Sequence, residues 1–126
     1  NKKYRTRVEN ILNSQKDYIN SYPTAYSTLL RAVLVLNREW HIVLAGDSAL
    51  ESYEELKKQL LRTLGSDYLI ITTKGMGNET WPLLQGRKDL TEPQVLICNE
   101  TSCLLPAYSV SELDKRLADA GILPRK

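Results

Sequence analysis

Residues 41–46, HIVLAG, form a short apolar run that ends in glycine. A continuous run of this length is typical of a strand buried on both faces, as in a parallel sheet. An amphipathic helical pattern follows over residues 53–64 and ends at Gly65, a natural helix terminator. Residues 68–73, YLIITT, make a second apolar run. This order predicts a βαβ unit with a right-handed crossover.

Further elements are predicted on both sides of this unit. Upstream, two amphipathic helices over residues 6–21 and 24–37 are separated by Pro23, which predicts an αα-hairpin. Downstream, residues 94–98 and 103–105 are predicted to pair as a β-hairpin. A closing helix follows. Capping boxes are predicted at the starts of two helices, from three Ser and Glu pairs spaced three apart: Ser48–Glu51, Ser52–Glu55 and Ser109–Glu112.

The predicted fold class is α/β, with an N-terminal helical hairpin over residues 1–37 and a βαβ-ββα sheet domain over residues 38–126. This order resembles the thioredoxin fold, including a proline, Pro93, at the entrance to the third strand. A small doubly wound sheet with an antiparallel edge strand has the same order. Thioredoxin chemistry needs a Cys-x-x-Cys motif at the start of the helix after the first strand. Residues 46–51 contain no cysteine, so we expect no disulfide oxidoreductase activity there.

Composition excludes several classes of function. The chain has 126 residues, is 42% hydrophobic and 25% charged, and carries a net charge of 17 − 15 = +2, which does not favour a nucleic-acid partner. No apolar run approaches the roughly 20 residues that span a bilayer, and no signal-peptide pattern is present. We therefore expect a soluble, cytoplasmic protein without a membrane partner. Because the chain starts at Asn1, we expect a fragment or a processed product.

The two cysteines, Cys98 and Cys103, lie opposite each other if the hairpin turn has four residues. Cross-strand neighbours are close enough for a disulfide bond. We favour buried reduced thiols, with a structural or regulatory disulfide and metal binding as alternatives. A structural zinc site needs four ligands, and His41 is the only histidine, so this chain would need carboxylates or a partner. His41 alone is interpreted as a solvated residue at a strand start.

Two further places are candidates for contacts. The Gly46-Asp47-Ser48 turn joins a strand to a helix, where exposed amides can bind an anion, although Asp47 and Glu51 favour helix capping instead. Gly75 and Gly77 begin like a dinucleotide fingerprint, but the third glycine is missing, so we interpret this segment as a flexible loop. Trp81 is predicted to pin that loop or to contact a neighbouring domain.

Three stretches resemble the C-terminal end of a family of large thioredoxin-domain-containing proteins of unknown function. They are YPTA at 22–25 with the following helix, HIVLAGD at 41–47, and PLLQGR at 82–87 continued by Pro93 and by Cys98-Asn99-Glu100-Thr101-Ser102-Cys103. The resemblance implies a longer protein with an N-terminal thioredoxin-like domain and a middle α/α barrel similar to N-acylglucosamine 2-epimerases and glycosidases. It implies that residues 1–37 end, or link from, that barrel. None of the family's presumed catalytic residues falls in this part.

We therefore expect a non-catalytic C-terminal accessory domain, without a cofactor or a metal, that packs against the helical barrel and the thioredoxin-like domain of the same full-length protein. The parent protein is expected to be an enzyme acting on a sugar-like substrate. A second hypothesis is a redox-responsive or metal-associated hairpin that uses Cys98 and Cys103. A third, from fold analogy alone, is a small-ligand site near Gly46-Asp47-Ser48 and the loop at 74–80.

Overall fold

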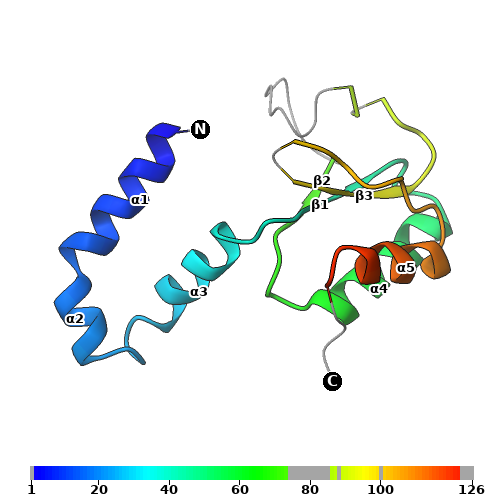
Figure 1. Ribbon diagram of the computed structural model, residues 1–126. Coiled ribbons are helices and arrows are strands. Elements are labelled where there is room, and N and C mark those ends of the chain that lie inside the picture. Colours follow the sequence, from blue (N-terminus) through cyan, green and yellow to red (C-terminus); the bar gives the residue numbers. More distant parts are fainter. Residues whose placement is uncertain (1, 74–85, 88, 100, 123–126) are drawn as a thin grey trace. The chain divides into compact units, whose positions relative to one another are not determined.

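The computed structural model describes residues 2–73, 86–87, 89–99 and 101–122. The described elements follow in the order α1, α2, α3, β1, α4, β2, β3 and α5. The chain divides into two compact units, Asn1–Leu36 and Asn37–Lys126. The first unit is helical and the second combines a sheet with helices, so the chain is a mixed α and β protein (Figure 1).

The helical unit contains α1 (Lys2–Ser14), α2 (Lys16–Ser21) and α3 (Ser27–Leu36). The single helix predicted over residues 6–21 is divided at Gln15, whose amide donates to the carbonyl oxygens of both Ile11 and Leu12 at 3.1 and 3.2 Å. The next helix starts at Ser27 instead of residue 24, because short-range hydrogen bonds hold a turn around Pro23. None of the side chains described between residues 5 and 35 is buried.

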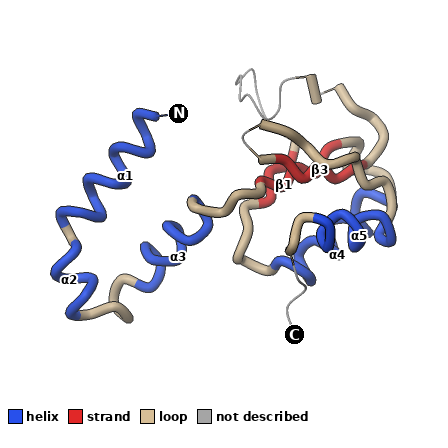
Figure 2. Tube along the Cα trace, viewed as in Figure 1, coloured by secondary structure: helices blue, strands red, loops and turns tan. Residues whose placement is uncertain are grey.

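The second unit is built on a sheet in the order β2-β1-β3. The central strand β1 (His41–Ala45) pairs in parallel with β2 (Ile70–Thr72) and antiparallel with β3 (Gln94–Cys98). Figure 2 shows β1 and β3 in red. Ile42 stands opposite both Ile70 and Ile97. All of β1 after His41 is fully buried, which confirms the prediction of a strand covered on both faces. The parallel pairing of β1 and β2 around one helix confirms the βαβ unit.

The predicted return strand at 103–105 is replaced by two isolated bridges, Cys98↔Cys103 and Val95↔Ala107. The partners are three residues apart on β3 (98 − 95) and four apart on the returning segment (107 − 103), so that segment holds one extra residue. Pro106 lies within it and has no amide to donate. The extra residue and the proline explain why the pairing is interrupted and no regular strand forms.

Two helices, α4 (Glu51–Leu64) and α5 (Val110–Asp119), cover one face of the sheet (Figure 1). The α4 side chains that reach the core are those of the predicted stripe, Tyr53, Leu56, Leu60 and Leu64. Leu113 and Leu117 contribute from α5, and alternate strand residues meet them. The other face holds a smaller apolar cluster of Val43, Ile71, Leu96 and Cys98. No helix in the described part of the chain is long and apolar enough to cross a membrane.

The capping prediction is confirmed for α5 and wrong for α4. The Ser109 hydroxyl accepts from the Glu112 amide at 3.3 Å, and the Glu112 carboxylate accepts from the Tyr108 amide at 2.8 Å. Helix α4 begins after Leu50, which offers no side-chain cap. The Asp47 side chain instead accepts from the Ala49 amide at 2.9 Å, and this local turn moves the helix start past Ser48.

Candidate functional site

The two cysteines form a disulfide bond between the end of β3 and the returning segment. Their sulfur atoms are 2.08 Å apart and their Cα atoms 3.9 Å apart. The interpretation as reduced thiols is therefore wrong, whereas the predicted cross-strand placement is correct. The two residues differ sharply in environment, because Cys98 is 0% exposed among apolar side chains and Cys103 is exposed. Only one side of the bond therefore faces solvent.

Asn99 organises the turn that brings the cysteines together. Its side-chain oxygen accepts from the amides of Thr101 and Ser102 at 3.0 and 2.8 Å, and from their two hydroxyl groups. Its own amide donates to the Ser102 carbonyl at 2.8 Å. An asparagine side chain that replaces backbone acceptors in this way is a common means of closing a tight turn. The turn therefore fixes the register of Cys98 and Cys103 independently of the covalent bond.

Arg87 contacts the exposed end of the disulfide. One guanidinium nitrogen, Nη2, lies 3.1 Å from Cys103 Sγ. A cation beside a sulfur favours the negatively charged thiolate over the thiol once the disulfide is open. Sequence reasoning missed this residue, because Arg87 and Cys103 are sixteen positions apart and no local pattern joins them. The two cysteines are therefore not equivalent: Cys103 is exposed and lies beside a cation, whereas Cys98 is buried.

A metal centre receives no support from the described residues. They contain no group of three or more His, Cys, Asp or Glu side chains placed to hold an ion. Both cysteine sulfurs are engaged in the disulfide. His41 stands opposite Cys98 in the β1–β3 ladder and is half-buried, although we had interpreted it as a solvated residue.

The Gly46-Asp47-Ser48 turn uses two backbone amides within the protein. The Asp47 amide donates to the Thr91 carbonyl at 2.9 Å, and the Ala49 amide donates to the Asp47 side chain. Gly46 has a φ of +114° and its Cα faces the backbone of Pro93. This turn is thus a junction between the end of β1 and the segment that leads into β3, with the Asp47 carboxylate occupying a position that an anion would need.

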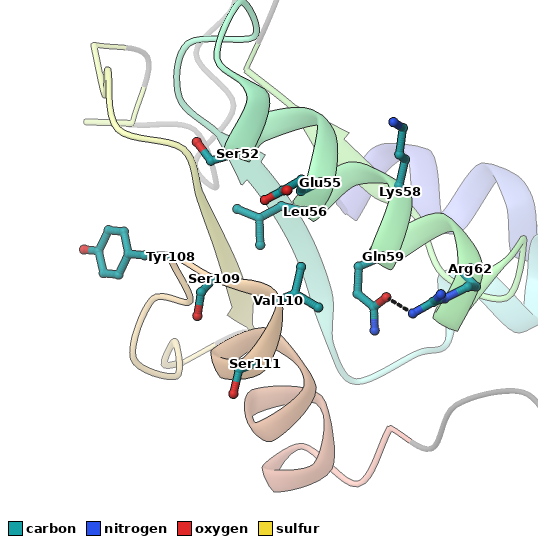
Figure 3. A pocket seen from close by; sticks show the side chains of 10 residues that line it. All are labelled: Ser52, Glu55, Leu56, Lys58, Gln59, Arg62, Tyr108, Ser109, Val110 and Ser111. Atoms are coloured by element: carbon teal, nitrogen blue, oxygen red, sulfur yellow. Dashed lines mark hydrogen bonds between the residues drawn. The ribbon is translucent and has the colours of Figure 1, made fainter.

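A groove of about 650 Å³ runs between α4 and the start of α5. Figure 3 shows Tyr108 and Val110 on one wall and Leu56, Gln59 and Arg62 on the other. Several of its polar groups already have partners: Gln59 donates to Asp114 at 2.6 Å and accepts from Arg62 at 2.5 Å. The groove is therefore a seam between two helices that is bridged by side-chain hydrogen bonds.

Trp81 and the segment with Gly75 and Gly77 lie outside the described residues. No family model, curated protein or solved structure matches the chain.

Proposed function

We propose that the chain is a non-catalytic C-terminal accessory domain of a larger thioredoxin-domain-containing protein and that it packs against the helical barrel of that protein. The observation that carries the proposal is a set of exposed apolar side chains on the helical unit. Its large apolar side chains include Ile11 at 51% and Leu34 at 63% exposure, and Tyr18 and Tyr22 are also exposed. Exposed apolar side chains that gather into one patch often mark a surface that another protein covers, and we assign these four side chains to such a surface.

We also propose that residues 37–126 are a thioredoxin-like domain without the redox motif. The order β2-β1-β3, the parallel β1–β2 pair and the antiparallel β1–β3 pair support this assignment. The placement of α4 and α5 on one face of the sheet supports it as well (Figure 1). The turn before α4 contains Asp47 and Ser48 at the place where thioredoxin chemistry requires cysteine, so we expect this turn to have a structural role only.

A binding experiment tests the accessory role. The probe is the isolated helical barrel of a protein of the family that the chain resembles, and complex formation is measured by calorimetry. Replacing Ile11 and Leu34 together by lysine is expected to abolish binding. Leu61, on α4, is a matched control because it is 54% exposed and lies in the other unit. Equal binding by the double variant and the Leu61→Lys control would overturn the proposal.

The disulfide favours a second candidate function, a redox-responsive hairpin. In this proposal Cys98 and Cys103 alternate between disulfide and dithiol, and the expected partner is the N-terminal thioredoxin-like domain of the same full-length protein. Incubation in buffers of graded ratios of reduced to oxidised glutathione, followed by rapid alkylation and intact-mass measurement, gives the potential of the pair. A potential within the range of cellular thiol buffers supports a switch, whereas a disulfide that resists all of these buffers is a structural bond only.

A further inference from the structure

We infer that Cys103 is the reactive sulfur of the pair and Cys98 the resolving one, so that every exchange with an outside thiol or disulfide goes through Cys103. This inference rests on the redox function proposed above and adds residue roles and a class of substrate. The two sulfurs differ first in burial. An attacking thiolate must reach a sulfur in line with the bond it breaks, and Cys98 offers no exposed surface, whereas Cys103 is exposed.

Arg87 distinguishes the two sulfurs by charge. Its guanidinium group lies 3.1 Å from Cys103 Sγ, so the negative charge that forms there on reduction is placed beside a cation. Thiolates, not thiols, are the nucleophiles of disulfide exchange, and a neighbouring arginine increases the fraction of thiolate at neutral pH. Cys98 lies in a cluster with Val43, Ile71 and Leu96, which disfavours a charged sulfur. Exposure therefore selects Cys103 as the sulfur that an outside thiol can attack, and charge selects Cys103 as the nucleophile of the reduced pair.

The exchange can be written with all atoms and electrons accounted for. A thiol, RSH, attacks Cys103 Sγ as its thiolate; a bond forms between these sulfurs, the Cys98–Cys103 bond breaks, and its electron pair leaves on Cys98, which takes up the proton that RSH released. A second RS⁻ attacks the R sulfur of the mixed disulfide and releases RSSR and the Cys103 thiolate beside Arg87. Two thiols are oxidised as one disulfide is reduced. In reverse, Cys103 attacks RSSR, and Cys98 then resolves the mixed disulfide.

The geometry of the turn suits the resolving step. Asn99 holds Thr101 and Ser102 through hydrogen bonds that do not involve sulfur. Reduction therefore leaves Cys98 beside Cys103 instead of releasing the returning segment. Leu104 further anchors that segment through its amide, which donates to the Ile97 carbonyl at 2.9 Å. The exposed side chains of Thr101 and Ser102 are small and polar, which fits the approach of a low-molecular-weight thiol.

The test compares single-cysteine variants of the whole chain. Cys98→Ala and Cys103→Ala are incubated with glutathione disulfide at neutral pH, and intact mass is measured over time. We expect Cys98→Ala to gain one glutathionyl group through Cys103 and Cys103→Ala to stay unmodified while folded. The reduced natural chain, pulsed with iodoacetamide and mapped by peptide mass, keeps the test independent of the folding of either variant. Cys103 is expected to react roughly tenfold or more faster than Cys98.

Arg87 is tested in the Cys98→Ala background as a positioning residue. Arg87→Gln is expected to slow alkylation of Cys103 roughly three- to tenfold at pH about 7, because less of the thiol is ionised. Arg87→Lys keeps the charge and should restore most of the rate. Arg31→Gln, which removes an exposed arginine from the helical unit, is the matched control and should change nothing.

The outcomes separate this inference from the redox function itself. If the glutathione titration finds no accessible potential, the redox function fails. If the pair titrates but Cys98 is modified first, or both thiols react equally fast, the couple is real and the assigned roles are wrong. Equal rates in the glutamine and lysine variants at position 87 would remove Arg87 from the mechanism. Selective modification of Cys103 with rescue by lysine supports each part.

Discussion

Replacing Gly46 by alanine should destabilise the sheet unit far more than the same change at another glycine of positive φ. Gly46 follows the central strand with a φ of +114°, a conformation that side chains rarely adopt. A Cβ atom built there lies 2.5 Å from the Pro93 Cα and 2.7 Å from the Glu92 carbonyl oxygen. Both are backbone atoms, so no flexible side chain can turn aside to make room.

The expected loss has two parts. The disallowed conformation costs about 1–3 kcal/mol, and the displacement of a packed backbone segment costs about 1–3 kcal/mol more. We therefore expect the free energy of unfolding to fall by about 4 kcal/mol, a large share of the roughly 5–15 kcal/mol typical of a domain. Gly121→Ala is the matched control, because Gly121 has a φ of +69° with no heavy atom within 4 Å of its Cβ position. That change should cost only about 1–2 kcal/mol.

Urea unfolding followed by circular dichroism measures both variants. The expected result is a lower midpoint for each, with the larger shift for Gly46→Ala and an unchanged slope. Equal losses in the two variants would refute the reasoning, because they would mean that the close approach to Pro93 has no energetic consequence. If Gly46→Ala does not fold in buffer, a titration with a stabilising osmolyte recovers the comparison, and the control must fold without it.

Three further predictions concern single side chains. Burial, opposed by Lys57 and reinforced by Glu54, raises the pKa of the Tyr53 hydroxyl above 10.0. The stability that the protonated hydroxyl contributes is therefore full below pH 10.0 and falls as pH rises through the folded-state pKa. Tyr53→Phe should remove this part of the alkaline destabilisation, as measured by urea midpoints across that pH range. Ser109→Ala should lower the free energy of unfolding by about 1 kcal/mol in thermal melts, because the helix cap is missing. Ser111→Ala, two residues further along the chain, should change it by almost nothing. Asn99→Ala should make the disulfide easier to reduce by about 30 mV in glutathione buffers, because about 1–1.5 kcal/mol of the free energy that closes the turn is lost. An unchanged or more negative reduction potential would contradict the role given to this turn.

Sequence reasoning was most successful where a pattern is local and repeated. The stripe of α4 and the apolar run of β1 depend on spacing alone, and both are buried as expected. The Cys98–Cys103 pairing also follows from a short turn, although spacing does not determine whether the sulfurs are bonded. The start of α4 could not be predicted, because the sequence offers two serine caps and, as an alternative, a local turn in which Asp47 accepts from the Ala49 amide. Local competition of this kind is decided by small energy differences.

Long-range contacts were beyond prediction for a different reason. The contact of Arg87 with Cys103, and the hydrogen bond of Gln59 to Asp114 across 55 positions, depend on how separate elements come together. No spacing rule links such residues in one sequence. The groove between α4 and α5 shares this origin, because its walls come from segments that are far apart along the chain.

The pairing of β1 with β3 has a consequence for the order in which the sheet unit is made. Ile42 is synthesised long before its partner Ile97, and the core also needs Leu113 and Leu117 from α5. Emerging from the ribosome, β1, α4 and β2 therefore expose an apolar surface until α5 has been added. Contacts so distant along the chain also slow folding, since a long loop must close first. We therefore expect the sheet unit to complete its fold only after α5 has left the ribosome.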